Sequence, residues 1–408
     1  MRFGMSEHDV SRPAPTRDLG ICVACGRTPL ALSVRRSSLP VMQNLVYATQ
    51  NEASVARTAD FVLAACQHCG FAFNAAFDPD MLVYDERYDN RVPSSVFKDY
   101  YANLAGRLCE RYGSENGLAV EIGCGKGEFL TALAREWVNG RFLGVDPGYE
   151  APPSGTAVSA KIHFLRDIFR PTTIQERPSL VICRHTLEHI PDPVSFLHQI
   201  RTALPDGVPI YLEVPDLRWI LKHQAFWDFC YEHCNYFTTE SLAIVAQQAG
   251  FQVVSSGVGF GEQYLWLEAV SHGAVPESQG ASSVVELLRR YSHDEAHHIA
   301  HTKAFVEAAT KRGVAVCLWG MATKGVVFSY LIDANRALIQ HCIDVNANKQ
   351  GRYAPGSAHL IQPPEVLQKV PGEIQILVMN SNYLNEIRDK CSSLGITASF
   401  ADASCQPL

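Results

Sequence analysis

Residues 118–130 constrain the fold of this chain more than any other segment. They read Leu-Ala-Val-Glu-Ile-Gly-Cys-Gly-Lys-Gly-Glu-Phe-Leu, an apolar strand pattern that enters a glycine-rich turn and then a helix pattern. Glycines in such a turn let a ligand approach the backbone closely. A second strand pattern, Arg141–Asp146, ends in a carboxylate suited to accept hydrogen bonds from a ribose diol. The sequence therefore predicts a parallel α/β sheet that binds a nucleoside-containing cofactor.

A glycine turn of this kind is a weak signal by itself, because dinucleotide-binding dehydrogenases carry a similar one. Here Glu121 precedes the glycines, and this acid-x-Gly-x-Gly-x-Gly form resembles the class I S-adenosylmethionine (SAM) methyltransferases more closely. Asp167 resembles their adenine-contacting acid, and the segment after the strand pattern 179–183 resembles the lining of their methyl-donor site. The resemblance implies SAM-binding positions at Glu121, Gly123, Cys124, Gly125, Gly127, Asp146, Asp167, Ile168, Arg184 and His185. For Arg184 and His185, a purely structural role is the alternative.

Four cysteines form two Cys-x-x-Cys-Gly motifs near the start of the chain. The glycine after each pair permits the left-handed turn that a zinc knuckle needs. Two such turns supply four thiolates, which complete the tetrahedral shell of a structural Zn²⁺. Redox-active dithiols and unpaired buried thiols are the alternatives, but a thioredoxin-like pair belongs in a βαβ context that neither motif has. We therefore predict a structural zinc site made of Cys22, Cys25, Cys66 and Cys69.

Aromatic and ionisable residues concentrate in residues 227–237, directly after the strand pattern of residues 208–215. Parallel α/β sheets place their ligands at the carboxyl ends of strands. In this segment Glu232 precedes His233, and an imidazole beside a carboxylate is the minimal combination for abstracting a proton near neutral pH. A buried histidine paired with glutamate for structural reasons is the alternative. A second Glu-His pair ends at His189, which we expect to assist across the pocket.

The chain has 408 residues, of which 47% are hydrophobic and 19% charged, as in a globular protein of two or three domains. Strand patterns alternate with amphipathic helix patterns in two separate regions, so we expect an α/β fold with two Rossmann-like domains. The expected parts are a flexible tail (1–20), a zinc-binding module (21–80), a helical connector (81–112), a SAM-dependent methyltransferase domain (113–272), a linker with a long helix (273–313) and a second, C-terminal Rossmann-like α/β domain (314–408).

The order of these parts, together with three further motifs, points to one family. Glu-His-x-x-Tyr-Phe lies at residues 232–237, Gly-Met-Ala-Thr-Lys-Gly at 320–325, and Asp-x-Asn-x-x-Lys-Gln-Gly-Arg-Tyr-x-Pro-Gly at 344–356. Over nearly its whole length the chain resembles the zinc-containing, SAM-dependent C-methyltransferases that act on nucleotide-linked deoxyketosugars. The resemblance implies a zinc-stabilised N-terminal lobe, a central SAM domain and a C-terminal lobe that helps to cover the substrate.

The same resemblance implies catalytic roles for His233, Glu232, His189, Tyr231 and Tyr88. His233 would be the base that removes the proton next to a ketone. The family's catalytic tyrosine lies three positions before this histidine, where the chain has Cys230. Either Tyr231 replaces it through a backbone shift, or the substrate differs. Tyr88 belongs to residues 84–88, which resemble the aromatic stretch that lines the family's substrate site.

We therefore expect methylation at carbon, because a C–H bond next to a carbonyl must be deprotonated before carbon attacks a methyl donor. The alternatives are an O- or C-methyltransferase of another natural product, or a non-catalytic module that binds zinc and SAM. A small-molecule partner is expected, since the net charge of −7 disfavours nucleic acid and no apolar run is long enough for a membrane span. Scattered thiols favour a reducing cytoplasm. The oligomeric state and the roles of Lys324 and Lys349 stay open.

Overall fold

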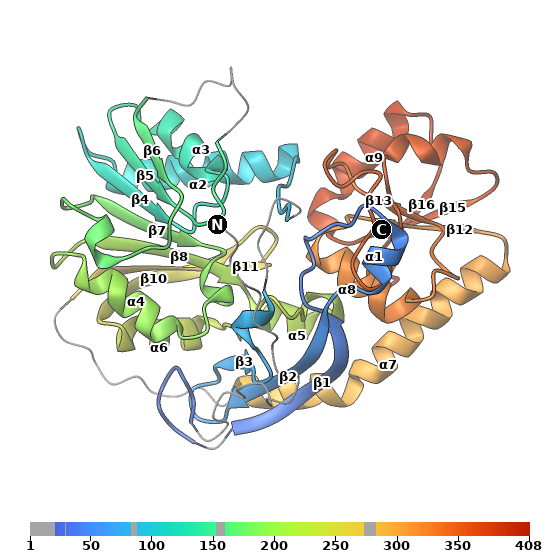
Figure 1. The fold of residues 1–408 in the computed structure, drawn as a ribbon, viewed down its shortest axis with the longest axis horizontal. Helices are drawn as coiled ribbons and strands as arrows, with labels where there is room; N and C mark the ends of the chain where they lie inside the picture. Colours follow the sequence, from blue (N-terminus) through green and yellow to red (C-terminus); the bar gives the residue numbers. More distant parts are fainter. Residues whose placement is uncertain (1–20, 29, 83–87, 152–159, 273–282) are drawn as a thin grey trace, which may run out of the picture.

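In a computed structural model of the chain, three β-sheets are arranged side by side, each with its own helices (Figure 1). The structure describes residues 21–28, 30–82, 88–151, 160–272 and 283–408. The expected tail (1–20), much of the expected linker (273–282) and Tyr84 lie outside these residues. The α/β class predicted from the sequence is confirmed by the two larger sheets.

The central sheet has seven strands. In spatial order they are β10 (Phe251–Gly259), β11 (Tyr264–Ser271), β8 (Pro209–Pro215), β7 (Leu180–Arg184), β4 (Leu118–Ile122), β5 (Arg141–Val145) and β6 (Ile162–Leu165). The strands from β8 to β6 are parallel, whereas β11 is antiparallel to β8 and β10 is antiparallel to β11. The chain order reverses between β4 and β7, and α/β sheets bind ligands outside the carboxyl ends of the strands at such a point.

Helices cover both faces of the central sheet (Figure 1). On one face, α2 (Ser95–Tyr112) and α3 (Glu128–Glu136) bury leucines against β4 and β7. On the other face, α4 (Pro193–Thr202) and α6 (Thr239–Gln248) do the same. This two-sided burial explains why the central strands are apolar at nearly every position instead of alternating.

The C-terminal sheet is entirely parallel and has five strands. In spatial order they are β14 (Ile361–Gln362), β13 (His341–Ile343), β12 (Ala315–Trp319), β15 (Ile374–Val378) and β16 (Ser399–Asp402). On one face, α9 (Leu384–Ser393) packs through Ile387 and Cys391. On the other, α7 (Ser283–Lys311) and α8 (Thr323–Asp333) join a core shared with the N-terminal sheet.

The N-terminal sheet is antiparallel and takes one strand from another part of the chain. Its order is β1 (Leu30–Pro40), β2 (Thr58–Cys66), β3 (Ala72–Asn74) and β9 (Asn235–Tyr236), and the helix α1 (Gln50–Ser54) follows β1. The short strand β9 comes after β8 and α5 (Leu217–Lys222), in the middle of the methyltransferase-like region. Hydrogen bonding to β3 therefore fixes the segment that carries His233 next to the cysteine module.

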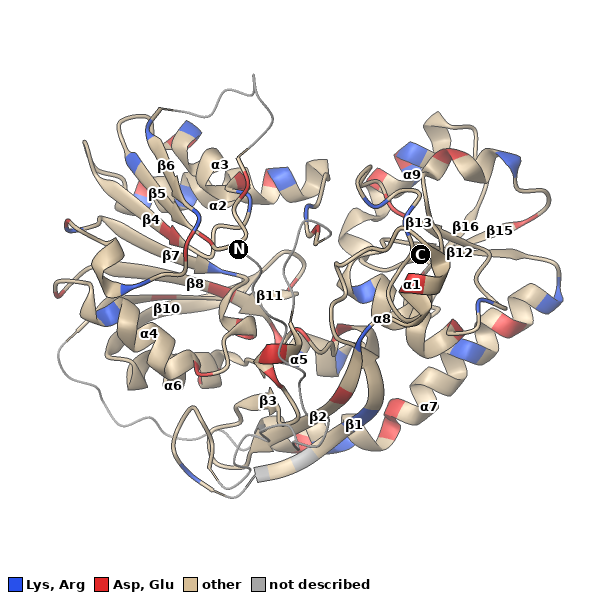
Figure 2. Ribbon diagram, in the orientation of Figure 1, with Lys and Arg blue, Asp and Glu red and all other residues tan. Residues whose placement is uncertain are grey.

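The long helix α7 joins the N-terminal sheet to the C-terminal sheet. Its buried residues Leu288, Tyr291 and Val306 belong to one core with residues of β2 and β12. Figure 2 shows basic and acidic segments alternating along the solvent side of α7, as expected for an amphipathic helix. None of the helices in the described part of the chain has the length and apolarity to cross a bilayer.

We predict that the buried contact of Arg36 holds this junction together. The Arg36 guanidinium donates to the Phe229 carbonyl at 2.9 Å and pairs with Glu295 of α7. Arg36→Met leaves the Phe229 carbonyl without its donor and leaves the partly buried Glu295 carboxylate without its cation, with only the Tyr291 hydroxyl still donating to it. The substitution should cost about 3–5 kcal/mol of unfolding free energy. Arg289→Met removes an exposed pair with Glu286 on the same helix and should leave the unfolding free energy nearly unchanged, because solvent screens such pairs. Denaturant unfolding of both variants tests this; equal losses would contradict it.

Candidate active site

The glycine turn after β4 lies at the carboxyl ends of the parallel strands. Gly123 and Gly125 both have positive φ, at +76° and +53°. A Cβ at Gly123 would lie 1.9 Å from the Thr186 hydroxyl oxygen, so this glycine is required by internal packing. A Cβ at Gly125 would meet no atom within 4 Å. Gly125 therefore faces open space, as a position that lies against a ligand should. Gly127, with φ +79°, is the N-cap of α3.

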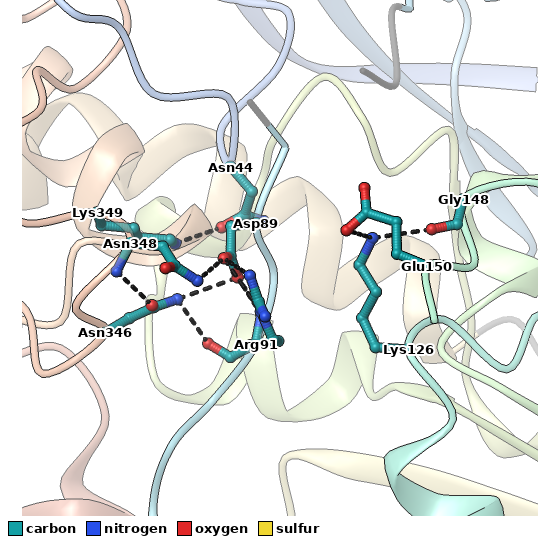
Figure 3. Close-up of polar contacts among 9 residues, drawn as sticks. All are labelled: Asn44, Asp89, Arg91, Lys126, Gly148, Glu150, Asn346, Asn348 and Lys349. Carbon is teal, nitrogen blue, oxygen red and sulfur yellow. Dashed lines mark hydrogen bonds and ion pairs between the residues drawn. The ribbon is translucent and has the colours of Figure 1, made fainter. Parts of the chain in front are cut away.

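Asp146, directly after β5, stabilises this turn by hydrogen bonding. Its carboxylate accepts from the Gly125 N–H at 2.8 Å and from the Gly148 N–H at 2.7 Å. A carboxylate has about four lone-pair positions, so two remain for a ribose diol. Lys126 closes the rim by donating to the Gly148 carbonyl at 2.8 Å and pairing with Glu150 at 3.2 Å (Figure 3). The loops after β4 and β5 are thus locked together.

Glu121 lies within β4, beneath the turn, and is 2% exposed. Burial raises the pKa of its carboxyl to about 8, and its Oε2 atom has no partner among the described residues. Next to it, Cys124 is buried. An unpartnered buried oxygen beside the open space at Gly125 fits a polar ligand such as SAM. The residues present therefore suit the cofactor that the sequence predicts.

Asp167 and Ile168 follow β6, the strand at one edge of the central sheet. Asp167 is exposed and pairs with Arg170 at 2.6 Å. Ile168, next to it, is 55% exposed. The structure thus brings the loops after β4, β5 and β6 to one edge of the sheet.

Arg184 and His185, at the end of β7, surround a buried carboxylate that sequence reasoning missed. Glu213 of β8 is fully buried and accepts from the Arg184 guanidinium at 2.6 Å. The His185 Nε2 atom lies 3.1 Å from the same carboxylate, and the ring packs on Tyr264. Burial lowers the pKa of His185, but the carboxylates of Glu188 and Glu213 raise it by more, so the net shift is upward. Arg184 and His185 therefore both have structural contacts with the buried Glu213 carboxylate.

His233 and His189 meet where the segment before β9 approaches the end of β7. Their ring centroids are 4.9 Å apart with planes at 83°. The Glu232 carbonyl accepts from His189 Nδ1–H at 3.1 Å, which leaves His189 Nε2 as the acceptor. Burial, with the neighbouring His189, lowers the pKa of His233 to about 3. The His233 imidazole is therefore neutral at physiological pH, with a lone pair free to take a proton.

The carboxylate closest to His233 is Glu188, which the sequence analysis did not single out. Ligand atoms of Glu188, His189 and His233 all lie within 4.8 Å of one another. The Glu232 carboxylate instead accepts from the Gln43 N–H and from the Tyr88 hydroxyl, the latter at 3.1 Å. Glu232, the sequence neighbour of His233, thus binds Tyr88. Glu188, from the turn after β7, lies beside the His233 imidazole instead.

Tyr231 is not brought to this cluster. Its hydroxyl accepts from the Asp78 N–H at 2.9 Å and donates to the Ala76 carbonyl at 3.4 Å, so it faces the cysteine module. Its ring packs on Phe77. Cys230, at the position of the family's tyrosine, is fully buried. Of the two candidate tyrosines, only Tyr88 has its hydroxyl beside Glu232.

The Tyr88 segment is held by the C-terminal domain (Figure 3). The Asp89 carboxylate accepts from the Asn346 amide at 3.0 Å and the Asn348 amide at 2.8 Å. Lys349 is buried and donates to the Asn44 side chain at 2.9 Å and to the Met321 carbonyl. Elsewhere on this domain, Lys324 pairs with Asp228 at 3.1 Å. Both lysines therefore have protein partners.

The four cysteines converge at the far end of β2. Cys22 Sγ lies 3.6 Å from Cys69 Sγ, and Cys25 Sγ lies 3.6 Å from Cys66 Sγ. Four sulfurs at about 2.3 Å from one Zn²⁺ would be about 3.8 Å apart, so the cluster fits a tetrahedral ion. Gly26 and Gly70 both adopt positive φ, as the knuckles require. His68 contacts Arg27 at 2.7 Å in an exposed position.

Two family models and several curated proteins match this chain. Residues 97–256 match the family described as a methyltransferase domain, and residues 267–397 match the C-methyltransferase C-terminal domain. C-methyltransferase NovU of Streptomyces niveus is 26% identical over 91% of this chain and 92% of its own length. A ubiquinone biosynthesis O-methyltransferase of Pseudoalteromonas translucida is 24% identical, over 40% of this chain and 72% of its own.

Among solved structures, 1,6-didemethyltoxoflavin-N1-methyltransferase of Burkholderia thailandensis aligns with 44% of this chain and 82% of its own. The sequence identity is 18% and the TM-score is 0.34.

We predict that Gly125→Val abolishes SAM binding without unfolding the protein, because the new side chain fills the open space at the turn. Asp146→Ala should weaken binding by about 1–3 kcal/mol through loss of a hydrogen-bonding partner. Gly395→Val is the matched control: Gly395 also has positive φ and open surroundings, but lies after α9, far from the turn in the sequence. Calorimetry of SAM binding tests this, and unchanged affinity in Gly125→Val would place the cofactor elsewhere.

Proposed function

Because the chain belongs to the SAM-dependent C-methyltransferases, we propose that it methylates a carbon next to a ketone, in a nucleotide-linked ketosugar. The observation that carries this proposal is the His233 imidazole, which lies within 4.8 Å of Glu188 and His189 in the turn that follows β7. The similarity to C-methyltransferase NovU, which spans nearly the whole of both chains, supports the choice of carbon as the methylated atom.

A C–H bond next to a carbonyl needs a base before carbon becomes nucleophilic. SAM, when bound, supplies an electrophilic methyl group. His233 would take the proton from carbon on its free lone pair, and the electron pair left behind would delocalise onto the ketone oxygen as an enolate. Carbon would then form its bond to the methyl group as the methyl–sulfur bond breaks, and the electron pair of that bond would stay on the sulfur of the departing donor. Proximity and orientation are the main contribution of the protein to such a step.

The neighbours of His233 would act on its position and charge. Glu188, within 4.8 Å, would stabilise the imidazolium that forms when the proton is taken. His189 is oriented by the Glu232 carbonyl, so its Nε2 atom accepts instead of donating. Burial raises the pKa of Glu232, whose carboxylate accepts from the Tyr88 hydroxyl. In our proposal Tyr88, rather than Tyr231, lies next to the acceptor.

A different acceptor is the second candidate. The family's tyrosine position is occupied by buried Cys230, and the Tyr231 hydroxyl is bound to the backbone at residues 76–78. These contacts favour a natural-product acceptor that is recognised without that tyrosine, methylated at carbon or oxygen on the same scaffold. Exchange of the acceptor's C–H proton with solvent distinguishes methylation at carbon from methylation at oxygen, because only the former requires that proton to leave. Competition by nucleotide-linked and unlinked ketones distinguishes the two acceptors.

We also propose that the four-cysteine cluster binds structural zinc and that residues 21–80 form the zinc-binding module. Four thiolates leave no open coordination position, so this ion would stabilise the fold without touching substrate. The cluster lies between β2 and β3, and β3 pairs with β9 two residues after His233. Zinc would thus stabilise the sheet to which the segment carrying the base is bound.

For zinc we predict about one tightly held ion per chain after gel filtration, as a four-thiolate site requires. Cys22→Ser and Cys69→Ser should lose this ion and lower the melting temperature more than they lower SAM affinity. Cys109→Ser changes a partly buried thiol outside the cluster and should keep the ion. Metal analysis and thermal unfolding test this. Wild-type protein free of zinc, with four titratable thiols in the cluster, would refute the site.

For the base we predict that His233→Asn keeps SAM binding and loses methyl transfer by about 10²–10⁴-fold, the usual effect of losing a general base. The variant should also stop exchange of the acceptor's α-proton with deuterated solvent, provided that the wild type shows such exchange. His198→Asn, an exposed histidine on α4, is the control and should behave as wild type. Methyl transfer by His233→Asn at the wild-type rate would mean that this imidazole is not the base.

A further inference from the structure

Glu188, His189 and His233 form a cluster whose side chains are all of the kinds that bind metal ions. Glu188 and His189 lie in a 3₁₀ turn after β7, and His233 lies before β9. Two hydrogen bonds hold these segments together, from the Asn235 amide to the carbonyls of Leu187 and Ile190. The three side chains therefore face one another on a fixed frame, with their ligand atoms within 4.8 Å.

Glu188 brings to this cluster a carboxylate with one unsatisfied oxygen. The side chain is buried, and the Oε2 atom has no hydrogen-bond partner among the described residues. Its Oε1 atom lies 3.7 Å from His185 Nδ1. A buried carboxylate oxygen without a donor is destabilising, so its presence calls for a partner. A cation bound between Glu188 and the two imidazoles would be such a partner.

The two histidines present lone pairs in the way that metal ligands do. Because a carbonyl only accepts, the contact with the Glu232 carbonyl fixes the proton of His189 on Nδ1 and leaves Nε2 free. Histidines that bind metals almost always donate their other ring N–H to a carbonyl or carboxylate in this manner. The His233 imidazole makes no hydrogen bond to any residue that the structure describes, so its lone pair is free too.

We propose that Glu188, His189 and His233 bind one divalent transition-metal ion, at a site separate from the four cysteines. Two imidazoles and one carboxylate favour Zn²⁺, Co²⁺ or Ni²⁺ over Mg²⁺, which prefers oxygen ligands. Bonds of about 2.1 Å place tetrahedral ligand atoms about 3.4 Å apart. Ligand atoms now within 4.8 Å reach that separation through small side-chain rotations.

An ion at this site would stop methyl transfer if His233 is the base, and this consequence rests on the proposed function. A neutral imidazole has a single lone pair. When that lone pair binds a metal, it is no longer available for the acceptor's proton. The metal and the proton thus compete for the same atom, and the site would make the enzyme sensitive to free transition-metal ions.

Equilibrium dialysis of the full-length protein against ZnCl₂, followed by metal analysis, tests the site without any activity measurement. The wild type should bind one zinc at the cysteines and a second, more weakly held zinc that MgCl₂ does not replace. Glu188→Gln, His189→Asn and His233→Asn should each lose only the second ion. Retention of the first ion shows that a variant is folded. His293→Asn, exposed on α7, is the control and should keep both.

A wild type that binds no second zinc, or a second zinc that all three variants retain, would overturn the proposal. The proposed function is judged separately, by adding zinc to the methyl-transfer assay and then removing it with a chelator. Reversible inhibition agrees with both proposals. Full activity with the second zinc bound would refute His233 as the base and leave the metal site standing. Absence of a second zinc, together with inactive His233→Asn, would refute only the metal site.

Discussion

The buried carboxylate of Glu213 is the constraint on which the active-site edge of the central sheet depends. A fully buried charge must be compensated, and here Arg184, Tyr211 and Tyr100 all donate to it. These partners come from β7, β8 and α2, so one carboxylate joins two strands and a covering helix. His185 completes the set, and its backbone N–H donates to the Glu213 carbonyl at 2.8 Å.

This compensation also sets the direction of the chain after β7. His185 adopts φ +48°, a left-handed conformation that costs a non-glycine residue of the order of 1–3 kcal/mol. The contacts of His185 with Glu213 and Tyr264 offset that cost. The backbone turns there, and the next residues place Glu188 and His189 opposite His233. The contacts that compensate the Glu213 carboxylate therefore help to position Glu188 and His189 beside His233.

Local motifs could be predicted from the sequence, whereas partners across the fold could not. The glycine turn and the cysteine knuckles are encoded within a few residues by backbone conformation and spacing, so Gly125 and Cys22 could be identified directly. The sequence favoured Glu232 as the partner of His233 because they are adjacent. In the structure successive side chains diverge: Glu232 contacts Tyr88, and Glu188 takes the place beside the imidazole. The pairing of β9 with β3, together with the hydrogen bonds from the Asn235 amide to the Leu187 and Ile190 carbonyls, fixes this arrangement.

The C-terminal domain contacts the segments that carry Asn44 and Tyr88. A buried lysine is costly unless its ammonium is satisfied, and Lys349 finds the Asn44 side chain and the Met321 carbonyl. Neighbouring amides of the same loop hold Asp89, the residue after Tyr88 (Figure 3). The tyrosine beside Glu232 is therefore positioned by a domain that is distant in sequence.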